Sequence, residues 1–105
     1  MDSNDLTINR IKTSVFEILP GSEIILFGSR ARNDDNVNSD YDLLIVIDAS
    51  IQVSDRLKFQ ALIRKKLAEQ NILADIIVQS RSDVERAKNF NGHIVRSALK
   101  EGVVV

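Results

Sequence analysis

Apolar residues early in the chain recur every three or four positions, at Ile8, Ile11, Val15, Ile18 and Leu19. This spacing is typical of one buried helix face and predicts an amphipathic helix over residues 5–19. Pro20-Gly21 is a strong breaker and ends that helix. The apolar run Glu23–Phe27 follows, and it predicts a short buried strand that ends at Gly28-Ser29.

The middle of the chain alternates between continuous apolar runs and helical periodicity. The polar stretch 30–39 predicts a short helix and a loop. Residues 40–47 are almost wholly apolar after Asp42, as expected of a central strand covered on both faces. A second helix is predicted over residues 52–69, and the run 72–78 predicts a third strand, apolar except for one aspartate.

Two further helices are predicted near the end of the chain. Ser82-Asp83-Val84-Glu85 fits a capping box at a helix start. Ile94, Val95, Ala98 and Leu99 mark a last helix, which Gly102 ends. The element order predicts an α/β (α+β) fold, a small mixed three- to four-stranded sheet flanked by helices. At 105 residues we expect a single domain, 1–105.

Composition narrows the class of protein. Hydrophobic residues are 44% and charged residues 28%, which is ordinary for a globular chain, and there is no cysteine. No apolar run approaches the ~20 residues of a membrane span, and the first residues lack a signal-peptide pattern. We therefore expect a cytoplasmic protein with no membrane partner. The net charge of −1 gives no strong signal for nucleic acid.

Three aspartates occupy positions where carboxylates are unusual. Asp40 and Asp42 are two apart at the head of a predicted strand, so their side chains should share one face. Like charges so placed repel one another unless a cation lies between them. Asp75 falls inside an apolar run, where we expect it to be buried and costly if unpaired.

Two kinds of partner could compensate these charges. A neighbouring Lys or Arg would make a structural ion-pair network. A hard divalent cation is the alternative, and oxygen ligands suit Mg²⁺ or Mn²⁺ better than zinc. The lack of cysteine and the single histidine, His93, argue further against zinc.

Gly28-Ser29 ends one predicted strand and opens a helix. Such a turn presents backbone N–H groups and a hydroxyl, which together can bind an anion, and glycine allows a phosphate to approach closely. Arg30 and Arg32 lie just beyond and could add positive charge. On these two residues alone, an ordinary turn with Ser29 as helix cap is the simpler interpretation.

The run Gly28–Arg32 followed by Ser39–Leu44 resembles the G-S-x-A-x-G…S-D-x-D-L signature of the DNA polymerase β-type nucleotidyltransferase superfamily. Residues 74–77 resemble the strand that carries its third carboxylate. The length and the ending 98–103 resemble its minimal branch, the MNT proteins, which are often paired with helical HEPN proteins in toxin–antitoxin modules. The resemblance spans about residues 8–105. Asn33 departs from it, since the family usually has glycine there.

The resemblance implies a role for each matching residue. Asp40, Asp42 and Asp75 would be the catalytic carboxylates and would hold magnesium, two ions in the family, with manganese as a possible substitute. Gly28, Ser29, Arg30 and Arg32 would bind the nucleotide, which is expected to be ATP. An acceptor hydroxyl would attack the α-phosphate and release pyrophosphate, with Asp75 accepting the hydroxyl proton.

The sequence leaves more than one function open. The first is a nucleotidyltransferase that acts on a nucleoside triphosphate and modifies a partner toxin. The second is an antitoxin-type binding module that covers a HEPN partner with little catalysis. A glycosyltransferase is disfavoured because its fold is larger. The terminal run Val103–Val105 either packs on the protein's own sheet or covers a partner, a HEPN-type protein or a second copy of this chain.

Overall fold

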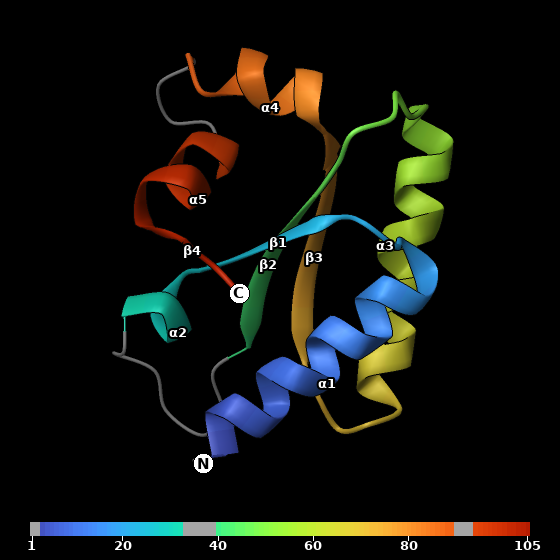
Figure 1. Cartoon of the computed structure of the whole chain (residues 1–105), viewed down its shortest axis with the longest axis vertical. Helices are drawn as coiled ribbons and strands as arrows, with labels where there is room; N and C mark the ends of the chain where they lie inside the picture. The colour runs from blue at the N-terminus through green and yellow to red at the C-terminus, as the bar shows by residue number, and fades with distance from the viewer. Residues whose placement is uncertain (1–2, 33–39, 90–93) are drawn as a thin grey trace.

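The described strands form one mixed sheet, in the order β3-β2-β1-β4 (Figure 1). The computed structural model describes residues 3–32, 40–89 and 94–105. The strands are β1 (Glu23–Phe27), β2 (Tyr41–Ile47), β3 (Ala74–Ser80) and β4 (Val103–Val104). The helices are α1 (Ser3–Ile18), α2 (Ser29–Arg32), α3 (Val53–Ala68), α4 (Arg81–Ala87) and α5 (Ile94–Glu101). The predicted α/β class and its small mixed sheet are confirmed.

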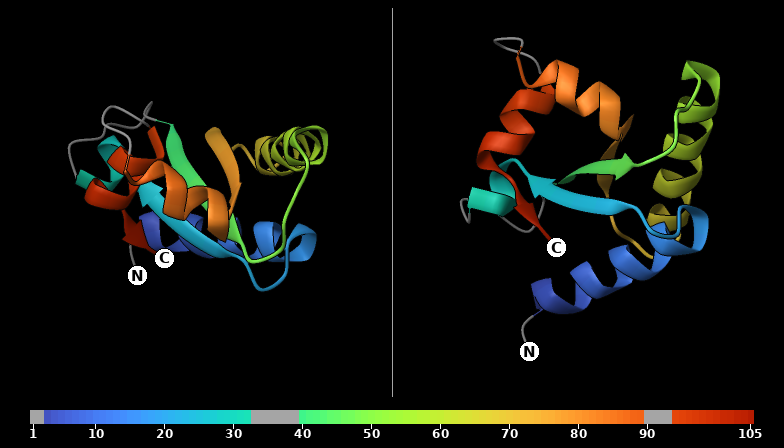
Figure 2. Two further views of the ribbon diagram at one scale, coloured as in Figure 1. Left: turned by 90° about the horizontal axis from the view of Figure 1, so that it is seen from above. Right: turned by 45° about the horizontal axis from the view of Figure 1, so that its top comes forward.

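Helices cover both faces of the sheet, as the apolar character of β2 predicts. Along β2 the side chains alternate: Leu43 and Ile45 meet α1 and α3, whereas Leu44 and Val46 meet α4 and α5. All four residues are at most 1% exposed. In the right-hand view of Figure 2, α1 and α3 lie together on the far side of the strands from α4 and α5. None of the described helices is long and apolar enough to cross a membrane.

Strand pairing fixes which residues meet. β1 and β2 are antiparallel, with Phe27 opposite Asp42. β2 and β3 are parallel, with Asp42 opposite Asp75. Because Gly28 directly follows Phe27, three separate parts of the chain converge at this end of β2.

The end of the chain forms the fourth strand. Val103 and Val104 pair antiparallel with Leu26 and Ile25 of β1, and the backbone N–H of Val105 donates to the carbonyl of Ile24 at 3.0 Å. Packing on the protein's own sheet, the first of the two expectations for these valines, is therefore found. Val103 and Val104 nevertheless stay 49% and 65% exposed.

Several predicted boundaries were wrong by two residues, including the start of α1 and both ends of β3. β3 begins at Ala74 rather than Ile72, because the N–H of Ile72 donates to the carbonyl of Leu67 and completes the end of α3. The residue before it, Asn71, takes the left-handed φ of 62° that often ends a helix. At the other end of β3, Ser80 rather than Ser82 caps α4.

Candidate functional site

Asp42 and Asp75 are neighbours on one face of the sheet. They are register partners on adjacent parallel strands, which lie about 4.8 Å apart. Both side chains therefore point to the α4–α5 side, while Tyr41 packs in the core on the opposite side. Asp40 lies just before β2 and is exposed. The fold thus brings Asp42 and Asp75 into direct register, and Asp40 lies two residues before Asp42.

The expectation that Asp75 is buried was wrong. Asp75 is exposed, and Asp42 is half-buried. The shift of the strand start explains the difference, because it places Asp75 second in β3 instead of mid-strand. β3 also lies at one edge of the sheet. The described part of α4 and α5 packs further along, through residues such as Leu44 and Val46. Asp75 is consequently open to solvent and to a ligand.

Gly28 lies against the carboxylate of Asp42. A Cβ atom at position 28 would stand 2.1 Å from Oδ2 of Asp42 and 3.0 Å from its Cγ. Gly28 also has φ of +74°, a conformation that residues with a side chain rarely adopt. Its carbonyl accepts from the N–H groups of Ala31 and Arg32 at 3.1 and 3.2 Å, which closes the α2 turn. Glycine is required here for both conformation and space.

Burial raises the pKa of the Asp42 carboxyl above its ordinary value of 3.8. The negative charges of Asp75 and Asp40 raise this pKa further, and the positive charge of Arg32 partly opposes them. The surroundings of Asp42 therefore disfavour its ionised, negatively charged form. A cation beside Asp42 would reverse that preference.

The two arginines of the turn differ in their surroundings. Arg32 is close enough to lower the pKa of Asp42, and its Nη1 lies 3.2 Å from Oε2 of Glu101, at the end of α5. The guanidinium of Arg30 instead lies 4.2 Å from the centre of the Tyr41 ring, a cation–π contact. Tyr41 faces away from Asp42, so the geometry favours Arg32 over Arg30 as a ligand for phosphate. Glu101 lies in the ending 98–103 that resembles the minimal branch, but no role beside Arg32 was predicted for it from the sequence.

Within the described residues, no three His, Cys, Asp or Glu side chains are gathered closely enough to hold an ion as a preformed set. What is present is the Asp42–Asp75 pair with Asp40 nearby, all oxygen donors suited to a hard cation. Their mutual repulsion, seen in the raised pKa of Asp42, is the kind of arrangement that a divalent cation stabilises. The residues at this site therefore fit magnesium chemically.

Some sequence expectations fall outside the described residues. Asn33, where the family pattern has glycine, and Ser39, which precedes Asp40 in the motif, both lie in the stretch 33–39. His93 lies in the stretch 90–93.

Comparison with known proteins identifies a family and a fold. The family model described as "Nucleotidyltransferase domain" matches residues 8–105. No curated protein sequence matches. Three solved structures share the fold at low sequence identity, so their likeness concerns the fold alone.

The first of these is a crystal structure of a toxin–antitoxin with AMP-PNP, at TM-score 0.62 and 16% identity, covering 91% of this chain and 69% of the other. The second is a complex of tri-AMPylated HEPN toxin with MNT antitoxin from Shewanella oneidensis, at TM-score 0.57 and 14% identity, covering 95% and 69%. The third, provisionally described as a minimal nucleotidyltransferase, gives TM-score 0.60 and 19% identity, covering 100% and 97%.

Proposed function

The chain belongs to the nucleotidyltransferase domain family, and from this premise we propose that it transfers a nucleoside monophosphate from ATP to a hydroxyl group of a partner protein. The observation that carries the proposal is the convergence of Asp42, Asp75 and Gly28 at one end of the sheet. Two structures of the same fold, one with AMP-PNP and one with an AMPylated HEPN toxin, support the donor and the kind of acceptor.

Binding would use the turn and the carboxylates together. The Gly28-Ser29 turn and Arg32 would hold the phosphates, since such a turn presents backbone N–H groups and a hydroxyl to an anion. Asp40, Asp42 and Asp75 would hold magnesium, two ions by resemblance to the family. Bound magnesium would neutralise charge on the phosphate oxygens.

The transfer itself is a displacement at the α-phosphorus. The acceptor oxygen forms a bond to that phosphorus, the bond from phosphorus to the bridging oxygen breaks, and pyrophosphate leaves. The hydroxyl proton passes to the carboxylate of Asp75, which acts as general base. The exposure of Asp75 on an edge strand supports this role, because a hydroxyl carried by another protein can reach it.

Intact-mass measurement tests the proposal. The chain is used to capture a co-expressed partner, and the complex is incubated with ATP and magnesium. We expect the partner to gain the mass of one or more nucleoside monophosphates. The Asp42→Asn variant should show no gain, whereas the charge-matched Glu85→Gln, on the exposed side of α4, should behave as wild type. Equal labelling by wild type and Asp42→Asn would exclude this site.

The exposure of Val103 and Val104 favours a second candidate function. An antitoxin-type module would act by covering a HEPN-type partner, with little or no catalysis. The same capture experiment separates the two functions. A binding module holds its partner equally well as wild type and as Asp42→Asn, and adds no mass to it.

A further inference from the structure

A cavity lies at the opposite end of the sheet from Asp42. Its volume is about 780 Å³, and it lies between the α1–β1 turn and the connection from β2 into α3. Ile47, at the far end of β2, is one of its walls. Ile47 lies five positions after Asp42 along the extended strand, a distance of about 16 Å. The cavity is therefore distinct from the proposed transfer site.

The walls of this cavity combine apolar and acidic groups. Leu19, Ile51 and Phe59 contribute apolar surface, and Asp48 and Asp55 contribute carboxylates. The volume is in the range of small-molecule sites. No Lys, Arg or His from the described part of the chain lines it. A triphosphate would meet only negative charge here, so this cavity is unsuited to the nucleotide.

Three residues that line the cavity, Ser22, Asp48 and Asp55, carry polar groups. The Oγ atom of Ser22 is buried and forms no hydrogen bond with any described residue. A buried hydroxyl without a partner is uncommon, because its lost hydration is uncompensated. Asp55 makes no ion pair within the described ranges, and Asp48 is largely exposed, with one oxygen 3.4 Å from Nε of Arg81. One acceptor-capable hydroxyl and two carboxylates thus border a largely apolar space.

We propose that this cavity binds a small organic ammonium compound, with an apolar chain or ring attached to the charged nitrogen. The apolar part would pack on Leu19, Ile51 and Phe59. The ammonium group would lie near Asp55 and Asp48 and donate a hydrogen bond to Ser22 Oγ. Charge complementarity favours this class, because both charged groups in the wall are anionic.

Titration with n-hexylamine, followed by ¹H–¹⁵N NMR, tests the proposal. 1-Hexanol and hexanoate serve as neutral and anionic compounds of the same chain length. We expect saturable shifts at the amides of Ser22, Ile51 and Gln52 with the amine, weaker shifts with the alcohol, and none with the acid. No saturable shift at millimolar amine, or equal shifts with hexanoate, would overturn the proposal.

Variants of the lining residues test where the ammonium group binds. Asp55→Asn should weaken hexylamine binding about two- to fivefold, as expected for one partly exposed charge interaction. Glu69→Gln, which removes one exposed charge at the other end of α3, should leave the affinity unchanged. Ser22→Ala should also weaken binding, and it tests the site independently if Asp55→Asn fails to fold. Unchanged affinity in the Ser22 and Asp55 variants contradicts the proposed binding mode.

Discussion

Gly28 follows the end of β1 and Asp42 lies in β2, yet each restricts the other. The carboxylate occupies the space that a side chain at position 28 would need. The Gly-Ser motif in the sequence explained Gly28 by its freedom of backbone angle and by access for phosphate. The contact with Asp42 adds a third reason, and it could not be predicted, because it depends on Phe27 pairing with Asp42.

Substituting Gly28 with alanine should therefore do more harm than backbone strain alone. Gly21 provides the matched control, since it has φ of +80° and no atom within 4 Å of an added Cβ. We expect Gly21→Ala to lower the free energy of unfolding by about 1–2 kcal/mol, the cost of alanine in the left-handed region. Gly28→Ala should lose more, because Asp42 must move. Urea denaturation measures both, and equal losses would argue against the contact.

The raised pKa of Asp42 makes a prediction about pH. With its folded-state pKa above the unfolded value, the folded protein binds the proton more tightly, so the stability that Asp42 contributes falls as pH rises through this window. At neutral pH and without metal, Asp42→Asn should be more stable than wild type. Below pH 3.8 the aspartate is protonated in both states, and the difference should vanish. If the difference in free energy of unfolding between Asp42→Asn and wild type persists in acid, the charge of Asp42 is not its cause.

At the scale of elements, apolar periodicity predicted most of the fold. β1 begins and ends at the predicted residues, and the ends of α3 differ by one residue from those predicted. The errors lie where hydrogen bonds rather than hydrophobicity decide a boundary. Ile72 is apolar and 6% exposed, as a strand residue would be, but its N–H completes α3. That one difference changed Asp75 from a buried carboxylate to an exposed one.

The cap of α4 was misassigned for a similar reason. Ser82 fits the capping-box pattern, but the chain is still extended at Ser80, whose Oγ accepts from the N–H of Asp83 at 3.2 Å. We predict that Ser80→Ala lowers the free energy of unfolding by about 1 kcal/mol, the usual value of an N-cap side chain. Ser82→Ala, at an exposed position, should cost clearly less. Thermal denaturation of the two variants decides between the two caps, and a larger loss for Ser82→Ala would restore the sequence-based assignment.

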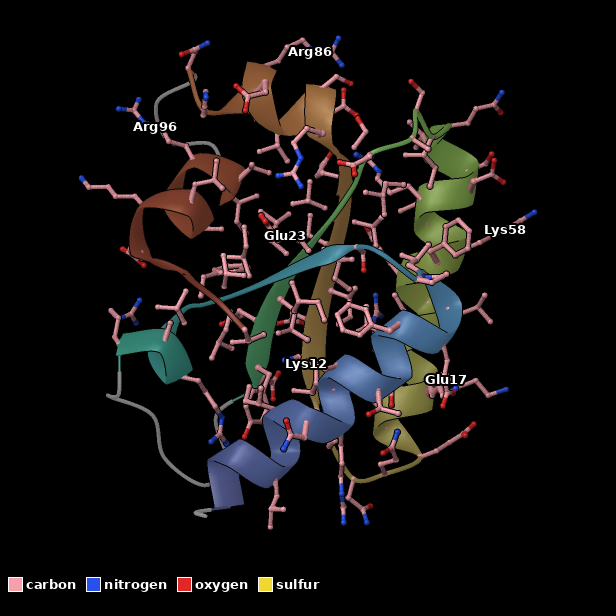
Figure 3. The ribbon with its side chains drawn as sticks, viewed as in Figure 1. Lys12, Glu17, Glu23, Lys58, Arg86 and Arg96 are labelled. Atoms are coloured by element: carbon pink, nitrogen blue, oxygen red, sulfur yellow. The ribbon has the colours of Figure 1, made fainter. Side chains whose placement is uncertain are left out.

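At the scale of the whole molecule, positive charge is dispersed. Lys58, Arg86 and Arg96 point outward from three different helices (Figure 3). No broad basic surface is expected from a net charge of −1. The proposed nucleotide site must therefore rely on local groups, namely the Gly28-Ser29 turn, Arg32 and the metal. Binding of the nucleotide should then depend strongly on magnesium.

Ligand-linked stability measures that dependence. Magnesium with ATP should raise the free energy of unfolding by ~2.7 kcal/mol at a hundredfold excess over Kd. Asp42→Asn should remove most of this gain, because it deletes a metal ligand. ATP with EDTA gives the metal-free reference and should add little. An equal gain in wild type and Asp42→Asn would indicate a structural role for the three aspartates instead.

The edge of the sheet at β4 makes the last prediction, which concerns assembly. Val103 and Val104 are apolar and about half or more exposed, on a two-residue strand that ends the sheet order. Exposed apolar edges favour association, so we expect this edge to lie in the interface with the proposed helical partner.

Val104→Lys should weaken the complex without unfolding the chain. Val53→Lys, on α3 and 61% exposed, is the matched control and should not. Size-exclusion chromatography with multi-angle light scattering, alone and with co-expressed genomic neighbours, measures both. A strictly monomeric protein that transfers nucleotide to a small free molecule would contradict this assembly.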